Sequence, residues 1–483
     1  MNFNKKLAVA VSSAVLLMAG QFALADSTTD IVDALVGKGV LTEEEGKLIT
    51  KGHESKKKAE GTVGFKDGFK INSGDGKSSM SVNGRIQADY RSFDVPSIAG
   101  NTSAASPNNA DTFDIRRAYL TAKGSFRNFI NFEATLDGAG DKGTSVSLKY
   151  YWLETAFSDK FKVRFGQFKM PGSLEQLTSS RFIDMTERDW VASLAPAVNK
   201  GIMIHGAPMA GVTYAASVSN GGLLADTGAG DVRETSNGAD GKSVNVRATA
   251  NIAELMGNKE AIVHVGGWYG FDNNLASQAV AFRTNARGTQ FFATPASTYS
   301  NPDATRYGLE GIAAYGPVKL SGEYGNLELS QDGGVLRTRD ITASYVNLSW
   351  LVTGESYASS YKNGLMDRLT PKNNFTGLDS AGWGAIELGL RYSSFDAKDF
   401  GVSDMVGTVA NGVNPHSTNK AHSYTAGAKW IVDPNTRFLA DYVVTDFDTT
   451  IMGTNSSSTP VVLTLPSGMK SERAINFRAQ FDF

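Results

Sequence analysis

Residues 130–137 have the sequence INFEATLD, in which apolar and polar side chains alternate without a break. Successive side chains of a β-strand point to opposite faces, so one face of this strand would be wholly apolar and the other wholly polar. Such a strand fits a wall that has lipid on one side and water on the other. The stretch therefore predicts one strand of a membrane-spanning β-barrel.

The same alternation continues on both sides of this stretch. Period-2 runs indicate about sixteen strands between Ser79 and Phe483, within the range of single-chain bacterial barrels. The predicted fold class is all-β, a transmembrane antiparallel β-barrel; a soluble β-sandwich or propeller is the alternative for so many alternating strands. The clearest further runs are 83–93, 161–165, 243–252, 306–315, 383–395, 422–432, 435–446 and 471–483.

The connections between these runs also alternate in length, with short ones such as 158–160 and long ones such as 220–241. Barrels of the outer membrane have short periplasmic turns and longer outer loops. Segment 354–381 breaks the alternation, because it is long where the strand order requires a short turn. We interpret it as an elaborated periplasmic turn or as a miscounted pair of strands.

The first 61 residues do not show this alternating pattern. Residues 1–25 predict a signal peptide, with two lysines before the apolar run 7–19 and small residues at the expected cleavage site. Residues 26–61 predict a short periplasmic helical segment or, equally, a solvated linker. The barrel is expected to occupy 62–483.

Composition narrows the class of protein further. The 483 residues include no cysteine, and beyond residue 25 no apolar run approaches the roughly 18–20 residues of a spanning helix. A net charge of −2 argues against a nucleic-acid partner. The last strand closes on Phe483 with apolar alternate positions, which resembles the assembly signal of bacterial outer-membrane proteins. We therefore expect an integral protein of the outer membrane of a Gram-negative bacterium, in contact with its lipid bilayer.

The polar faces of the strands predict a basic lumen. A side chain on a barrel wall can point only outward to lipid or inward to the lumen. If the apolar side chains point outward, the polar side chains that alternate with them point inward. By this assignment fourteen basic and nine acidic side chains face the lumen, which would enrich anions there. The alternative is that interior charges pair across strands and only solvate the wall. The fourteen are Arg85, Arg91, Arg117, Lys123, Lys149, Lys162, Arg164, Arg247, Arg306, Lys319, Arg391, Lys429, Arg437 and Arg478. Arg116, the neighbour of Arg117, is expected near the membrane interface.

The connection after residues 161–165 is the least regular part of the chain, because alternation does not resume until Gly201. We interpret 171–199 as the third outer loop, folded inward into the barrel. Its charges are mixed, and a net acidic constriction could favour solutes other than anions. The loop residues concerned are Arg181, Arg188, Glu175, Asp184, Glu187 and Asp189.

Several motifs resemble the phosphate-selective porin O and P family: GRIQADY at 84–90, RRAYL at 116–120, RFGQF at 164–168, SSR at 179–181, TER at 186–188 and LVTGE at 351–355. The resemblance covers most of residues 79–483, includes the long segment 354–381, and implies a 16-stranded, trimeric outer-membrane channel. It also implies an inward-folded third loop and an arginine-lined path for anions. The motifs around Arg85, Arg117, Arg188 and Arg247 match well enough to carry that role over.

The expected function is passive diffusion of small hydrophilic solutes with a preference for anions such as phosphate. A general or sugar-type porin is the alternative, with Tyr90, Tyr151 and Trp268 as possible stacking surfaces. The five histidines have no partner motif, so no catalytic residue, metal or cofactor is expected. The residues expected along the solute path are Arg85, Arg117, Lys162, Arg164, Arg181, Arg188, Arg247 and Arg391.

Overall fold

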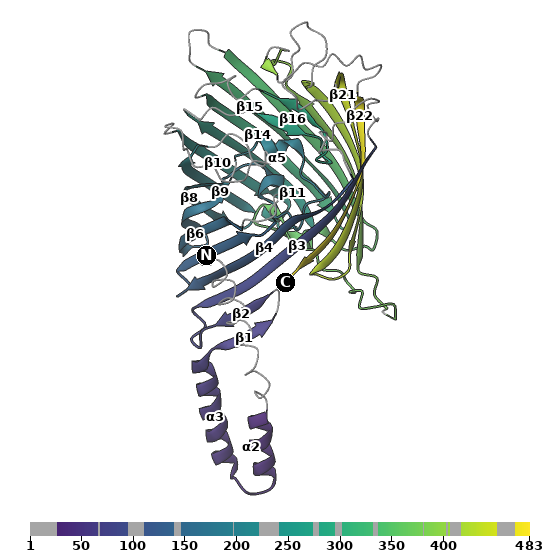
Figure 1. Ribbon diagram of the computed structural model, residues 1–483. Coiled ribbons are helices and arrows are strands. Elements are labelled where there is room, and N and C mark those ends of the chain that lie inside the picture. Colours follow the sequence, from purple (N-terminus) through teal and green to yellow (C-terminus); the bar gives the residue numbers. More distant parts are fainter. Residues whose placement is uncertain are drawn as a thin grey trace, which may run out of the picture. The chain divides into compact units, whose positions relative to one another are not determined.

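Sixteen long strands form one closed antiparallel barrel in the part of the chain that the computed structural model describes (Figure 1). The predicted fold class and strand number are therefore confirmed. The described residues are 27–65, 68–94, 111–139, 146–196, 198–221, 241–273, 280–294, 302–331, 337–379, 381–401, 404–405, 417–451 and 469–483. The predicted signal peptide lies outside them.

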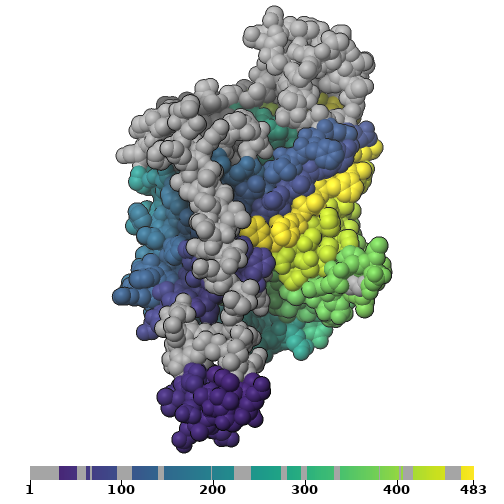
Figure 2. All heavy atoms as spheres, turned by 60° about the horizontal axis from the view of Figure 1, so that its bottom comes forward, coloured from purple at the N-terminus to yellow at the C-terminus, as the bar shows by residue number. Residues whose placement is uncertain are grey.

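The barrel strands are β3 (Ser79–Asp94), β4 (Thr112–Phe126), β5 (Ile130–Asp137), β6 (Ser147–Ser158), β7 (Phe161–Lys169), β8 (Val198–Met209), β9 (Val212–Asn220), β10 (Lys242–Asn251), β11 (Ala261–Asp272), β14 (Asp303–Tyr315), β15 (Val318–Gln331), β16 (Arg337–Leu351), β19 (Ala385–Asp396), β20 (Lys420–Ile431), β21 (Thr436–Ile451) and β22 (Met469–Asp482). Each strand pairs with the next in sequence. The last strand, β22, pairs with the first, β3, and closes the barrel, as Gly84 and Phe483 exchange backbone hydrogen bonds of 3.0 and 3.1 Å. Figure 2 shows the C-terminal strand, in yellow, against blue strands from the beginning of the barrel.

Burial follows the two faces that alternation predicts. In β22 the outward residues Ile475, Phe477 and Phe481 are 43–50% exposed, whereas Arg478 among them is 2% exposed. Apolar side chains thus cover the outer surface, where lipid would lie, and polar side chains point inward. Because the inward arginine is so well covered, other parts of the chain must fill much of the lumen.

Three connections fold into the lumen and provide this cover. The β7–β8 loop carries α4 (Leu174–Leu177) and α5 (Trp190–Leu194), and the β11–β14 loop carries the hairpin of β12 (Ala281–Arg283) and β13 (Gln290–Ala293). The β16–β19 connection carries the 3₁₀ turn η1 (Tyr357–Ser360) and the hairpin of β17 (Tyr361–Lys362) and β18 (Leu365–Met366). Segment 354–381 is therefore an elaborated turn and not a pair of barrel strands.

Apolar contacts hold these three segments together. Trp190, Val191 and Leu194 of α5 share a buried cluster with Phe291 and Phe395. Leu174 of α4 shares a second cluster with residues of the β16–β19 connection. Because α5 packs on β15 and β16, the inserted segments fill that side of the barrel and leave open space along the strands from β3 to β10.

The N-terminal region forms a compact unit of its own, made of described residues in 27–64 and 70–79. It contains α2 (Ser27–Gly37), α3 (Glu43–Glu60) and most of β1 (Thr62–Phe65) and β2 (Phe69–Asn72). A capping box starts α3, because Thr42 and Glu45 each accept the other's backbone N–H.

A short helix, α6 (Ile252–Leu255), forms the β10–β11 turn. No described helix is long and apolar enough to cross a membrane.

Candidate functional site

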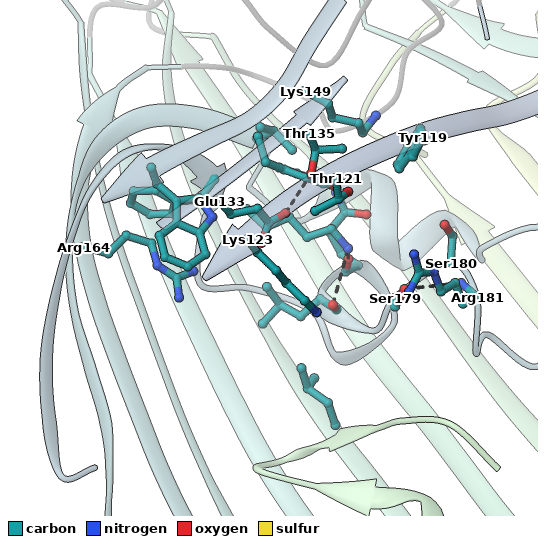
Figure 3. A pocket seen from close by; sticks show the side chains of 18 of the residues that line it. Tyr119, Thr121, Lys123, Glu133, Thr135, Lys149, Arg164, Ser179, Ser180 and Arg181 are labelled. Carbon is teal, nitrogen blue, oxygen red and sulfur yellow. Dashed lines mark hydrogen bonds between the residues drawn. The ribbon is translucent and has the colours of Figure 1, made fainter. Parts of the chain in front are cut away.

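A cavity of about 1320 Å³ runs inside the barrel between the wall strands and the inserted segments. Figure 3 shows Ser179, Ser180 and Arg181 of the β7–β8 loop on one side of this space and Lys123 and Arg164 of the wall on the other. Among the described residues, thirteen basic side chains line it against three carboxylates, Glu133, Asp137 and Asp159. The thirteen are Arg85, Arg116, Arg117, Lys123, Lys149, Lys162, Arg164, Lys169, Arg181, Arg188, Arg247, Arg287 and Lys362. The cavity is therefore strongly basic although the whole chain is slightly acidic.

The β7–β8 loop is fixed at its start by a wall carboxylate. Glu323 of β15 accepts the backbone N–H groups of Leu174 and Glu175 at 2.9 and 2.8 Å, and the Tyr345 hydroxyl donates to it at 2.9 Å. Glu323 is only 4% exposed, so these donors replace the water that its carboxylate would otherwise bind. This contact anchors the start of the loop to the wall at β15.

The four carboxylates of the loop turn away from the cavity, since none of them lines it. Glu175 pairs with Arg391 at 2.7 Å and Asp184 with Lys319 at 2.5 Å. Glu187 forms salt bridges with three arginines: Arg116 (2.8 Å), Arg478 (3.0 Å) and Arg91 (3.2 Å). The pKa of Glu187 lies well below its ordinary value, because the charges of Arg116 and Arg478 outweigh the effect of burial. A loop that is acidic in sequence thus presents a basic surface to the cavity.

The fourth carboxylate, Asp189, is the N-cap of α5 and accepts the Val191 N–H at 3.1 Å. Asn285 of the β12–β13 hairpin donates to its other oxygen at 3.2 Å. Burial raises the pKa of Asp189 to about 6, and the neighbouring Arg391 only partly opposes this shift. The ionised form is therefore disfavoured in the folded protein.

We predict that this raised pKa makes the protein more stable at low pH. The folded state retains a proton on Asp189 up to about pH 6, whereas the unfolded chain loses it near pH 4. The free energy of unfolding therefore falls as pH rises between those values, because ionised Asp189 is disfavoured only in the folded state. Asp189→Asn keeps the cap and should raise stability by about 1–3 kcal/mol at pH 7.5 but not at pH 4. Thermal unfolding in detergent at both pH values checks this, and a variant that tracks the wild type at both would contradict it.

A set of five basic side chains gathers around residues 178–181 of the loop; we call it the cationic cluster. Lys169 and Arg188 donate to the Thr178 carbonyl at 3.4 and 2.8 Å. Arg85 donates to the Ser180 hydroxyl at 2.7 Å. The fourth member, Arg117, is linked to the loop through Gln87. Gln87 accepts a hydrogen bond from Arg117 and donates one to the Ser180 carbonyl, each at 2.9 Å. The fifth, Arg181, donates to the Gly84 carbonyl at 3.4 Å.

No member of the cationic cluster has a carboxylate partner among the described residues; all their acceptors are neutral. The Nε atoms of Arg85 and Arg181 have no described hydrogen-bond partner. Burial, with a contribution from Arg85, lowers the pKa of Arg181 to about 10, so the guanidinium stays charged at neutral pH. Buried cations that no carboxylate hydrogen-bonds are poorly compensated, and the cluster therefore favours a mobile anion at this place.

The other expected path residues differ in their surroundings. Lys162, Arg164 and Arg247 line the cavity but pair with Asp159 (3.3 Å), Glu154 (2.6 Å) and Glu310 (2.5 Å), respectively. Arg391 is not among the lining residues, because its guanidinium is bound to Glu175 and only 2% exposed. Of the eight expected residues, the cationic cluster thus contains four: Arg85, Arg117, Arg181 and Arg188.

Sequence alternation misplaced or missed several lining residues. Arg116, expected near the interface, lines the cavity and bonds Glu187. Lys169 was not expected, because alternation places it on the face opposite to Lys162, Arg164 and Phe168, which line the cavity. It is the last residue of β7, and its ammonium group donates to carbonyls of the inserted loop, so it points inward. Arg287 and Lys362 lie in inserted hairpins, which alternation does not place.

The aromatic residues considered for sugar stacking lie elsewhere. Tyr90, Tyr151 and Trp268 are not among the described residues that line the cavity. Trp268 is 4% exposed and belongs to the apolar cluster around α5. Gly308 lies beneath its indole, where a Cβ would come within 2.4 Å of the ring, so Trp268 has a packing role.

The chain is similar to several known porins. A relative, Porin O of Pseudomonas aeruginosa, is 26% identical over 406 residues, which is 78% of this chain and 85% of the relative. A solved anion-selective porin from Comamonas acidovorans is 14% identical with a TM-score of 0.47, covering 84% of this chain and all of that one. The trimer form of OmpT from Vibrio cholerae is 12% identical with a TM-score of 0.47, covering 84% and 99%. The model of the family described as phosphate-selective porin O and P matches residues 80–483. The chain therefore belongs to the phosphate-selective porin O and P family and is an outer-membrane porin, a channel and not an enzyme.

Proposed function

We propose that the protein conducts small hydrophilic anions by passive diffusion, with phosphate as the preferred solute. The observation that supports this most is the cationic cluster. Among the described residues, its five basic side chains have neutral acceptors only, and thirteen basic side chains and three carboxylates line the cavity. A charged cleft with low-dielectric walls concentrates counter-ions, and anions would therefore outnumber cations at this place.

Phosphate fits the donors of the cluster. A guanidinium presents a planar fork of N–H groups that matches two oxygens of one phosphate. The Ser179 and Ser180 hydroxyls line the cavity beside Arg85 and could replace water around the same anion. Other cations continue along the wall, including Lys123, whose ammonium group faces the cavity. A series of moderate sites would allow an anion to enter without being trapped.

Block of chloride current by phosphate tests the proposed preference. The purified porin in a planar bilayer bathed in KCl should show a dose-dependent fall in conductance when phosphate is added, because the slower anion occupies the cluster. Sulfate at the same charge concentration is the control for anion binding in general. Conductance that phosphate leaves unchanged would contradict phosphate preference, and block by an oligosaccharide alone would favour the sugar-type porin.

The proposed assembly is a homotrimer, the state that the sequence resemblance to this porin family implies. A mass of three chains in detergent, measured by light scattering without heating, would agree with it. A monomeric mass would contradict it.

A further inference from the structure

The hairpin of β17 and β18 reaches the cavity from the end of the barrel that carries the short turns. Its tip is Asn363-Gly364, with φ values of 50° and 76°, as expected of a two-residue hairpin turn of type I′. Lys362, Asn363 and Leu365 line the cavity. The tip touches the opposite wall, because a Cβ on Gly364 would lie 2.7 Å from the Thr249 hydroxyl oxygen. The hairpin thus presents one ammonium group to the solute path.

A chain of buried polar contacts begins and ends on this hairpin. Tyr361 bonds His264 Nδ1 at 2.7 Å through its hydroxyl, and His264 Nε2 bonds the Glu310 carboxylate at 3.0 Å. Arg247 donates to Glu310 at 2.5 Å and, with the same terminal nitrogen, to the Gly364 carbonyl at 3.0 Å. Both sides of the hairpin tip are therefore tied to one carboxylate of β14.

Histidine suits the central position in this series of hydrogen bonds. A neutral imidazole protonated on Nε2 donates to the carboxylate and accepts from the tyrosine hydroxyl, so both of its contacts are satisfied. The side chains of His264 and Glu310 are fully covered. Apolar residues could fill such a site at lower desolvation cost, whereas a closed polar chain fixes the direction of its partners. What it fixes here is the position of the hairpin that carries Lys362.

We propose that Lys362 is a second anion contact, at the short-turn end of the path, and that His264 is the residue that positions it. This inference rests on the proposed anion conduction. Lys362 is exposed to the cavity, and no described carboxylate pairs with it, in contrast to Lys162 on the wall. An anion leaving the cationic cluster would therefore meet one further uncompensated charge before it exits.

A double-mutant cycle on ion selectivity tests both roles. Lys362→Gln should lower the chloride-to-potassium permeability ratio about two- to threefold in a KCl gradient. His264→Phe should lower it by a similar factor, and Lys362→Gln should then add little, because the hairpin no longer holds the ammonium group in the path. Tyr361→Phe removes only the hydroxyl that begins the chain and serves if His264→Phe does not assemble.

The outcomes separate this inference from the proposed function. An unchanged ratio in Lys362→Gln overturns the anion contact, and effects of Lys362→Gln and His264→Phe (or Tyr361→Phe) that multiply independently overturn the positioning role. Either can occur while the wild-type channel still prefers anions. A wild-type channel without anion preference would instead contradict the proposed function.

Discussion

Replacing Arg85 and Arg117 with glutamine together should lower the chloride-to-potassium permeability ratio about tenfold or more. Both guanidinium groups line the cavity and, within the described part of the chain, hydrogen-bond only to neutral acceptors, so their charge acts on passing ions. A charge a few ångströms from an ion in a partly hydrated site contributes on the order of 1 kcal/mol, or about fivefold in the ratio for each residue. Reversal potentials of the variant and wild type in the same KCl gradient give the two ratios.

Two control variants separate charge from structure. Arg85→Lys with Arg117→Lys keeps both charges and should retain anion selectivity while losing much of the block by phosphate, since lysine lacks the planar fork. Lys420→Gln removes a cation of β20 that is paired with Asp396 and does not line the cavity, so its ratio should match the wild type. A double glutamine variant as selective as Lys420→Gln would contradict the role of the cationic cluster.

Replacing Glu323 with alanine should release the β7–β8 loop and at least about double the single-channel conductance, with increased current noise. The change removes the acceptor of the Leu174 and Glu175 N–H groups and leaves those buried donors without a partner, at about 1–3 kcal/mol each. The barrel strands do not depend on this side chain. Single-channel recording at fixed KCl concentration measures the effect.

Tyr345→Phe is the matched control for this change. It removes one hydrogen bond to Glu323 but leaves the carboxylate and its two backbone contacts in place. Its conductance should stay close to that of the wild type. Equal conductance in all three proteins would mean that the loop keeps its position without Glu323.

Alternation was enough to predict the barrel because every wall residue has only two possible directions. INFEATLD at 130–137 became β5, and the terminal run became β22, which closes the barrel on β3. The same rule placed Arg85 and Arg117 inside, where they line the cavity. It works within the paired part of a strand, and it failed at Lys169, the last residue of β7, whose side chain binds the inserted loop.

The inserted segments could not be predicted in this way. The composition of the β7–β8 loop predicted an acidic constriction. In the structure, Glu175 and Asp184 instead pair with an arginine and a lysine on strands more than 130 residues away in sequence. Arg391 was expected in the solute path on the same grounds and instead holds Glu175. Which charges remain free depends on the path of the loop across the lumen, and that path depends on long-range contacts such as those of Glu323.

The reversal potential of the wild-type channel in a KCl gradient tests most directly whether the lumen selects anions. With chloride and potassium of nearly equal mobility in water, an unselective pore gives a potential near zero. The thirteen basic and three acidic residues that line the cavity in the described ranges predict a potential of the sign set by chloride diffusion. A potential of the sign set by potassium, or one near zero, would contradict selection of anions by the cationic cluster.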